Sequence, residues 1–132
     1  MLRVPIAQGS SRSSAAPTRN AITSSYVCFE YAPTGEPTVV SVVNRGVADD
    51  ANAWVVDGNT LSLRVSRVDK RLRTHASVDA ATWRMVRIFT IDSPVAPMIG
   101  FEAQCPNAEG CAVKFDDVRF VEDCLLDLRM GS

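Results

Sequence analysis

Apolar residues alternate with polar ones along most of the chain from Tyr26 onward. In the stretch TLSLRVSRV, for example, polar residues separate Leu61, Leu63 and Val65, as a half-buried strand requires. β-Branched and aromatic residues are frequent, and turn residues interrupt the pattern about every ten positions. The pattern predicts strands at residues 26–32, 38–44, 60–68, 71–78, 82–91, 98–105 and 111–121.

Short links join several of these predicted strands. Residues 68–70 and residues 79–81 are links short enough to place their flanking strands side by side and antiparallel. In SVDAATW, Asp79 is placed to accept backbone N–H groups in the turn, and Trp83 is placed to cover the adjoining core. Because no long stretch has a helical period, the sequence predicts an all-β fold built as an antiparallel sandwich of two sheets.

The predicted strand at 71–78 also has a predicted inner and outer face. Alternation points Leu72, Ala76 and Val78 inward. The opposite positions are then exposed to water, and they are Arg71, Arg73, His75 and Ser77.

Composition changes near the start of the first strand. Residues 1–25 are rich in Ser, Ala, Pro and Arg and poor in bulky apolar groups, which predicts a disordered leader, a folded domain at 26–124 and a tail at 125–132. The leader also has the composition of a mitochondrial transit peptide, but Pro5 and Pro17 interrupt any amphipathic helix. A cytoplasmic location is the expectation, with mitochondrial import as the alternative.

The charges of the chain nearly cancel, with 14 basic residues against 15 acidic ones. No strong field therefore attracts the chain to nucleic acid or to an anionic membrane, and neither is expected as a partner.

The four cysteines are Cys28, Cys105, Cys111 and Cys124. Without a secretory signal, they are expected to be reduced. There is no C-x-x-C pair and only one histidine, so no metal site and no cofactor are expected. Cys105 and Cys111 flank the PNAEG turn and could face each other, and the sequence leaves open whether they bond.

Carboxylates are the main candidates for catalysis, because glycoside hydrolysis uses a pair of them. Asp116 and Asp117 are adjacent on a predicted strand, so they point to opposite faces and cannot act as a pair there. No acylating nucleophile motif and no phosphate-binding loop occurs, and no catalytic residue is assigned. A hydrolase or lyase that brings Glu30 and Asp49 together by folding remains an alternative.

A succession of short motifs, rather than any single one, carries a family resemblance: FEY at 29–31, VVSVVNRGVAD at 39–49, LRVSR at 63–67, SVD with Trp83 and Arg87, and IGFEAQCP to VKF at 99–115. From about residue 26 to residue 121 the chain resembles the regulation-of-enolase-like family of domains of unknown function, in the concanavalin A-like lectin and glucanase superfamily. The sequence departs from the family pattern at Ala48, Asp50 and Ala80, which stand where the family has Ser, Trp and Gly.

The resemblance implies a concanavalin-like jelly roll without established catalysis. It covers only the C-terminal part of the family domain, so strands are expected to be missing at the N-terminus, and self-association or a non-functional fragment are further alternatives. The expected function is non-enzymatic binding of carbohydrate or of a protein partner, such as a glycolytic enzyme like enolase. The candidate binding surface consists of Glu30, Asp49, Trp83, Arg84 and Arg87, with burial of Trp83 as the alternative.

Overall fold

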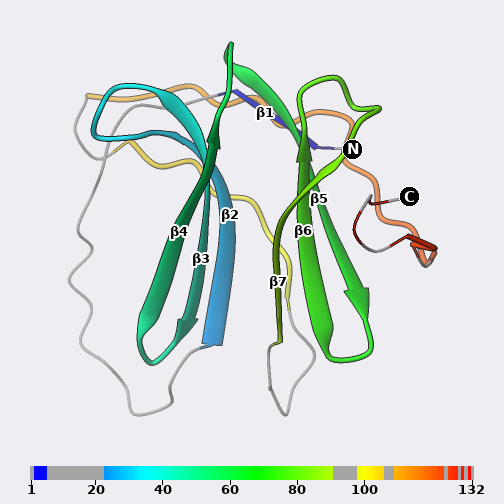
Figure 1. The fold of residues 1–132 in the computed structure, drawn as a ribbon. Coiled ribbons are helices and arrows are strands. Elements are labelled where there is room, and N and C mark those ends of the chain that lie inside the picture. The colour runs from blue at the N-terminus through cyan, green and yellow to red at the C-terminus, as the bar shows by residue number, and fades with distance from the viewer. Residues whose placement is uncertain are drawn as a thin grey trace.

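The computed structural model describes residues 2–5, 23–90, 98–105, 109–123, 125–127, 129 and 131. The regular elements within these ranges are all strands (Figure 1): β1 (Leu2–Pro5), β2 (Thr23–Tyr31), β3 (Pro37–Arg45), β4 (Ala48–Val55), β5 (Thr60–Val68), β6 (Arg71–Ser77) and β7 (Arg84–Thr90). The predicted all-β class is confirmed. None of the described residues forms a helix long and apolar enough to cross a membrane.

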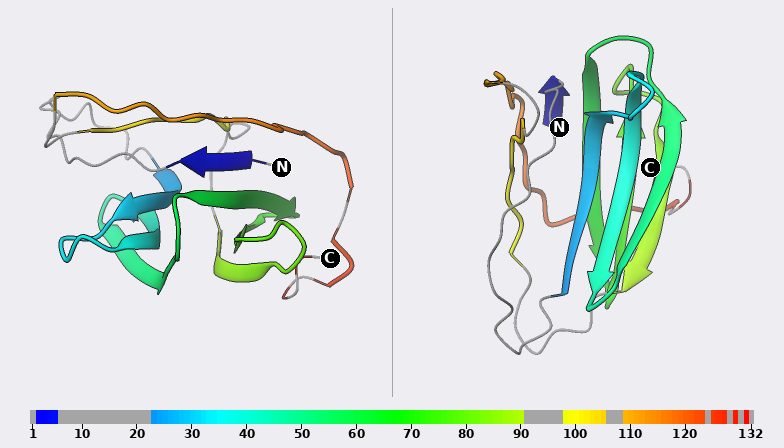
Figure 2. Two further views of the ribbon diagram at one scale, coloured as in Figure 1. Left: turned by 90° about the horizontal axis from the view of Figure 1, so that it is seen from above. Right: turned by 90° about the vertical axis from the view of Figure 1, so that its left-hand side faces the viewer.

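The strands form two antiparallel sheets. One has the order β1-β5-β6-β7 and the other has the order β2-β3-β4. The main hydrophobic core takes residues from both sheets, including Phe29 and Val39 from one and Leu61 and Ala76 from the other. A core shared in this way makes the two sheets a sandwich, as predicted. Figure 2 shows residues 98–105 and much of residues 109–123 as a further layer beside the two sheets, on the side where β1 lies.

Tight turns connect neighbouring strands. Gly46, with a φ of 87°, begins the link from β3 to β4, and Asp69, with a φ of 55°, begins the link from β5 to β6. In the link from β6 to β7, Asp79 Oδ1 accepts hydrogen bonds from the backbone N–H groups of Ala81 at 2.9 Å and Thr82 at 2.7 Å. The predicted role of Asp79 as the cap of this turn is therefore confirmed.

Strand β4 was not predicted from the sequence pattern. Its residues ADDANAWV include two aspartates, an asparagine and three alanines, which have low strand propensity. β4 lies at the edge of its sheet, and most of its side chains are exposed. An edge strand held mainly by backbone pairing to β3 gives no apolar alternation to detect.

The predicted strands at 98–105 and 111–121 are wrong. The described residues of these two segments form no strand and contain only an isolated bridge at Asp116. Most apolar side chains there are exposed, including Met98, Ile99 and Phe120, so burial does not support regular pairing. Phe101 and Phe115 nevertheless bring the two segments together, with ring centroids 5.3 Å apart.

Strand β1 and the start of β2 fall inside the segment predicted as a leader. β1 pairs antiparallel with β5, from Leu2 opposite Leu63 to Pro5 opposite Thr60. The free edge of β5 offers backbone hydrogen bonds, so pairing there does not depend on apolar alternation. The rest of the predicted leader, residues 6–22, lies outside the described residues.

The outward face predicted for β6 is confirmed at Arg71, which is exposed, and is wrong at the other three positions. His75 is fully buried, and Arg73 and Ser77 are also buried, whereas Val78 is exposed. The cause is a contact from the far end of the chain: a Cβ at Gly131 would lie 3.1 Å from both His75 Cδ2 and Trp83 Cβ. Gly131 therefore lies against the outer side of the sheet that contains β6, at His75 and Trp83.

Candidate functional site

The strongest candidate site lies where edge strand β4 of one sheet meets edge strand β7 of the other. We call the residues Asp49, Trp54, Arg84 and Arg87 the β4–β7 seam. An irregularity in each strand places these side chains on a common face.

In β7, Thr74 is opposite Arg87 and His75 is opposite Met85, so Val86 is an extra residue. Arg84 and Arg87 are three residues apart and would point to opposite faces of a regular strand. Because of the bulge they pair with Ala76 and Thr74, which lie two residues apart on one face of β6. Both arginines therefore point to the inner side of their sheet.

A bulge also occurs in β4. Trp54 is opposite Val39 and Asn52 is opposite Val40, so Ala53 is the extra residue. Trp54 consequently shares a face with Asp49, which is opposite Val43. The two bulges bring one carboxylate and one indole from β4 to the side from which the two arginines of β7 extend.

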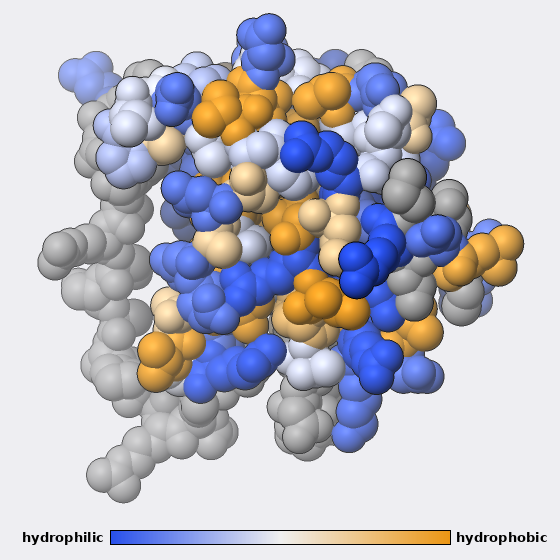
Figure 3. All heavy atoms as spheres, viewed as in Figure 1, coloured by the Kyte–Doolittle hydropathy of each residue, from blue (hydrophilic) through white to orange (hydrophobic). Residues whose placement is uncertain are grey.

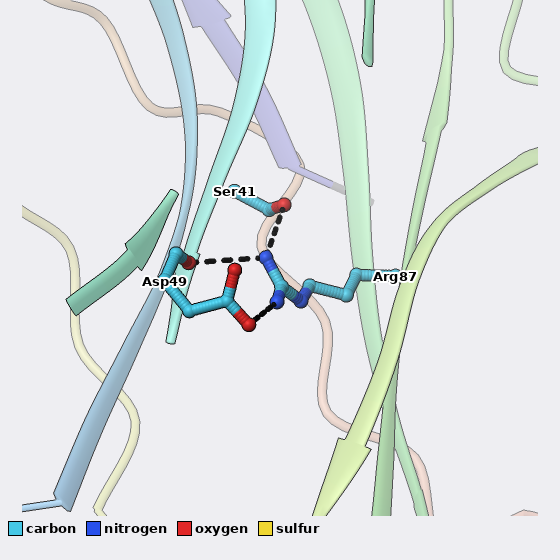
Figure 4. Close-up of polar contacts among 3 residues, drawn as sticks. All are labelled: Ser41, Asp49 and Arg87. Carbon is cyan, nitrogen blue, oxygen red and sulfur yellow. Dashed lines mark hydrogen bonds and ion pairs between the residues drawn. The ribbon is translucent and has the colours of Figure 1, made fainter. Parts of the chain in front are cut away.

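Arg87 connects the two sheets by polar contacts (Figure 4). Its Nη2 lies 2.5 Å from Asp49 Oδ2, and its Nη1 donates to the Asp49 carbonyl oxygen at 3.1 Å and to Ser41 Oγ at 3.4 Å. The Arg87 side chain is 18% exposed and the Asp49 side chain is 71% exposed. The carboxylate thus stays open to solvent while the guanidinium holds it in place.

Arg84 makes the second connection. Its Cζ lies 3.9 Å from the centre of the Trp54 ring, which is a cation–π contact. Arg84 is exposed and Trp54 is half-buried, and the indole also packs against the main core. The guanidinium is therefore fixed by stacking while its N–H groups face solvent, and the seam carries two positive charges and one negative charge.

The surface around the seam is mostly polar. On the face seen in Figure 3, hydrophilic residues gather in the middle and extend from the β4 side towards the β7 side, with smaller hydrophobic patches above and below. A fixed guanidinium and a fixed carboxylate on such a surface are groups that recognise polar or acidic ligands.

Trp83 was predicted in the same surface, but it belongs to a different contact. It is 9% exposed, and Arg64 stacks on it with Cζ 3.9 Å from the ring centre. Arg64 also donates from Nη1 to the Gly131 carbonyl oxygen, and burial lowers the pKa of Arg64. Trp83 thus packs in the covered outer side of its sheet, away from the seam.

Glu30 also lies apart from the seam. It is opposite Thr38 on β3, whereas Asp49 is opposite Val43, and residues 38 and 43 point to opposite faces of β3. Glu30 and Asp49 therefore do not converge as the pair that the alternative hydrolase or lyase would use.

Around Glu30 the structure places a cysteine and further acids. Burial and then Asp50 raise the pKa of Glu30. Burial, followed by Glu30, Glu102 and Asp50, raises the pKa of Cys28 to about 11, so this thiol is protonated at neutral pH. Among the described residues, no group of three or more His, Cys, Asp or Glu side chains is placed to hold a metal ion.

The paired aspartates of the FDD stretch have local partners. Asp116 Oδ2 lies 3.0 Å from Lys114 Nζ, and Asp117 Oδ1 lies 2.8 Å from Arg119 Nε. Each carboxylate is engaged by a basic neighbour two residues away along the chain.

The structure therefore brings together three of the five predicted surface residues, Asp49, Arg84 and Arg87, and adds Trp54 and Ser41. Sequence analysis missed Trp54 because β4 itself was not predicted. The available signal was an isolated tryptophan three residues before the DGNT turn, at the end of a polar stretch.

Comparison with known proteins yields one match. A family described as "Protein of unknown function (DUF1349)" matches residues 25–123. No curated protein and no solved structure matches the chain.

Proposed function

Because the chain belongs to the DUF1349 family of proteins of unknown function, we propose its function from the seam: a non-catalytic binding domain that recognises carbohydrate bearing carboxylate groups. The observation that carries the proposal is the pair of bulges that aligns Arg84 and Arg87 with Asp49 and Trp54. Bulges beside functional sites serve to aim side chains in this way.

The chemistry of the seam suits such a ligand. Arg84 is held on an indole and presents N–H donors to solvent, so it loses little freedom when it binds a carboxylate. Asp49 is held by Arg87 and can accept hydrogen bonds from sugar hydroxyls. The net positive charge of the four seam residues favours acidic saccharides over neutral ones. A concanavalin-like sandwich, which the sequence resemblance implies, agrees with this function.

The test is an array of neutral and uronic-acid-containing glycans probed with the full chain. We expect binding to the acidic glycans, with a loss of about 10-fold to 100-fold in Arg84→Gln, because a charge-assisted hydrogen bond contributes about 1.5–3 kcal/mol. Arg71→Gln is the matched control, since Arg71 is an exposed arginine on β6 and not in the seam. Equal binding by Arg84→Gln, or an empty array, would refute the proposal.

A protein partner is the second candidate, and a different observation favours it. The segment from residue 98 to residue 126 exposes many large apolar side chains: Met98, Ile99, Phe101, Val118, Phe120, Val121 and Leu126. Exposed apolar surface of this kind is typical of interaction sites.

The partner that the resemblance suggests is a glycolytic enzyme such as enolase. Co-elution of the purified chain with purified enolase tests this, with Phe120→Ser expected to abolish co-elution and Arg84→Gln expected to leave it unchanged.

A further inference from the structure

The segments 98–105 and 109–121 carry a feature that binding by the seam does not use, namely two cysteines that face each other. Cys105 is close enough to Cys111 to help raise the pKa of the Cys111 thiol, after desolvation. Four residues further from the turn on each segment, Phe101 meets Phe115 with ring centroids 5.3 Å apart. From the first contact to the second, the residue number falls by four on one segment and rises by four on the other. The two segments are therefore antiparallel.

This register suits a disulfide. Directly opposite residues of an antiparallel pair have Cα atoms about 4.5–5.5 Å apart, and a disulfide needs Cα atoms about 4.4–6.8 Å apart. Neither Cys105 nor Cys111 forms a disulfide in the structure. Cys111 is exposed and Cys105 is half-buried, so a soluble oxidant reaches Cys111 first.

We propose that Cys105 and Cys111 form a redox-active dithiol, which a small-molecule disulfide such as oxidised glutathione converts into an intramolecular disulfide. The Cys111 thiolate attacks one sulfur of glutathione disulfide, forms a mixed disulfide and expels one glutathione thiolate. The Cys105 thiolate then attacks Sγ of Cys111 and expels the second glutathione thiolate. The two cysteine thiols lose two protons and two electrons in total, and one glutathione disulfide takes them up and becomes two molecules of reduced glutathione.

The other described cysteine has a different environment. The Cys28 thiol is partly buried beside Glu30, Asp50 and Glu102, which oppose its ionisation. Desolvation and the hydrogen bond with Cys105 also raise the pKa of Cys111, so closure should accelerate as the pH rises above neutral. Selectivity for the pair therefore comes from its geometry and exposure rather than from an acidic thiol.

The bond would fix the register of the segment that exposes Phe101, Val118 and Phe120. Phe101 and Phe115 would stay opposite each other without depending on the ring contact alone. Because the link closes a short loop, we expect the oxidised chain to melt a few degrees higher than the reduced chain.

Peptide mapping tests the proposal cleanly, because trypsin places this pair alone in one peptide. There is no Lys or Arg between Arg87 and Lys114, so residues 88–114 form a tryptic peptide whose only cysteines are Cys105 and Cys111. The full chain is equilibrated with oxidised glutathione, quenched with an alkylating reagent and digested. We expect this peptide to be lighter than the reduced peptide by two hydrogen atoms and to carry no alkyl group. Cleavage after Glu109 should leave its two halves joined until a reductant is added.

Two variants and one condition serve as controls. Cys28→Ser with Cys124→Ser keeps the pair and should close as the natural chain does, whereas Cys111→Ser should leave Cys105 alkylated or carrying one glutathione. In urea the disulfide between Cys105 and Cys111 should form at least about tenfold more slowly, since the fold no longer holds the thiols together. Separate alkylation of both thiols, bonds to Cys28 or Cys124, or closure that is as fast in urea would each overturn the proposal. These outcomes are independent of glycan binding.

Discussion

Two arginine–tryptophan stacks in this chain have the same distance and opposite surroundings. Arg64 lies 3.9 Å from the ring centre of Trp83, and Arg84 lies 3.9 Å from that of Trp54. Trp83 is buried and Arg64 bonds the Gly131 carbonyl oxygen, whereas Arg84 is exposed at the seam. The same contact therefore contributes mainly to stability where other residues cover it, and it presents hydrogen-bond donors to a ligand where they do not.

The largest expected difference between the two stacks is in stability. Trp83→Ala should lower the free energy of unfolding by about 3–5 kcal/mol, because it removes a buried aromatic ring. Trp54→Ala should cost about half as much, because Trp54 is only half-buried. Urea denaturation followed by far-UV circular dichroism measures both variants. An equal or larger loss in Trp54→Ala would contradict the distinction between the stacks.

The cover over the Arg64–Trp83 stack can be disturbed directly. Gly131→Ala should destabilise the chain by about 1–2 kcal/mol, since Gly131 has a φ of 71° and its new Cβ would lie 3.1 Å from His75 and Trp83. Gly100→Ala is the control, because a Cβ there meets no atom within 4 Å. Similar melting temperatures for the two variants would show that the tail does not hold the stack.

The turn that leads to Trp83 offers a stabilising change. Ala80 has a φ of 62°, a conformation that glycine adopts without steric cost. Ala80→Gly should raise stability by about 0.5–1 kcal/mol, after subtracting the greater freedom of glycine in the unfolded chain. Ala81→Gly, at the next position of the same turn, should destabilise the chain instead. Thermal melts of the two variants give the comparison.

At the seam, the Arg87–Asp49 ion pair should contribute less. A double-mutant cycle with Arg87→Gln and Asp49→Asn should give a coupling energy of about 0.5 kcal/mol, because the Asp49 side chain is 71% exposed. The coupling should decrease as salt is added, since exposed charges are screened. A coupling that is large and independent of salt would mean that the pair is a buried structural link rather than an accessible one.

The last prediction concerns Asp79 and the pH dependence of stability. Hydrogen bonds from the N–H groups of Thr82 and Ala81 and from the Ser77 hydroxyl hold the pKa of Asp79 well below its usual range. The folded pKa lies below the unfolded value of about 3.9, so this stabilisation is complete above that value and is lost as the pH falls through the folded pKa. In Asp79→Asn, the free energy of unfolding should therefore fall less steeply as the pH is lowered into the acid range. An unchanged acid limb in urea titrations below pH 4 would contradict this.

Much of the fold followed from local patterns. Alternation located most of β2, β3, β5, β6 and β7, and Asp79 identified its turn, because these features depend on neighbouring residues. Strand β4 was missed, since an edge strand with polar side chains needs no alternation. Asp49, Arg84 and Arg87 were recognised as surface candidates, but their grouping with Trp54 depends on one extra residue in each of two strands.

The amino-acid sequence alone determined that this chain forms antiparallel strands with apolar side chains between two layers, because period-two alternation is a property of adjacent residues. Only the tertiary structure decided which polar residues are accessible. Gly131, more than 45 positions away in the chain, packs against the buried His75 and Trp83, and Asp49 meets Arg87 because two bulged edge strands aim these side chains towards each other. Contacts between distant segments set burial and register, and those contacts have no signature in local spacing.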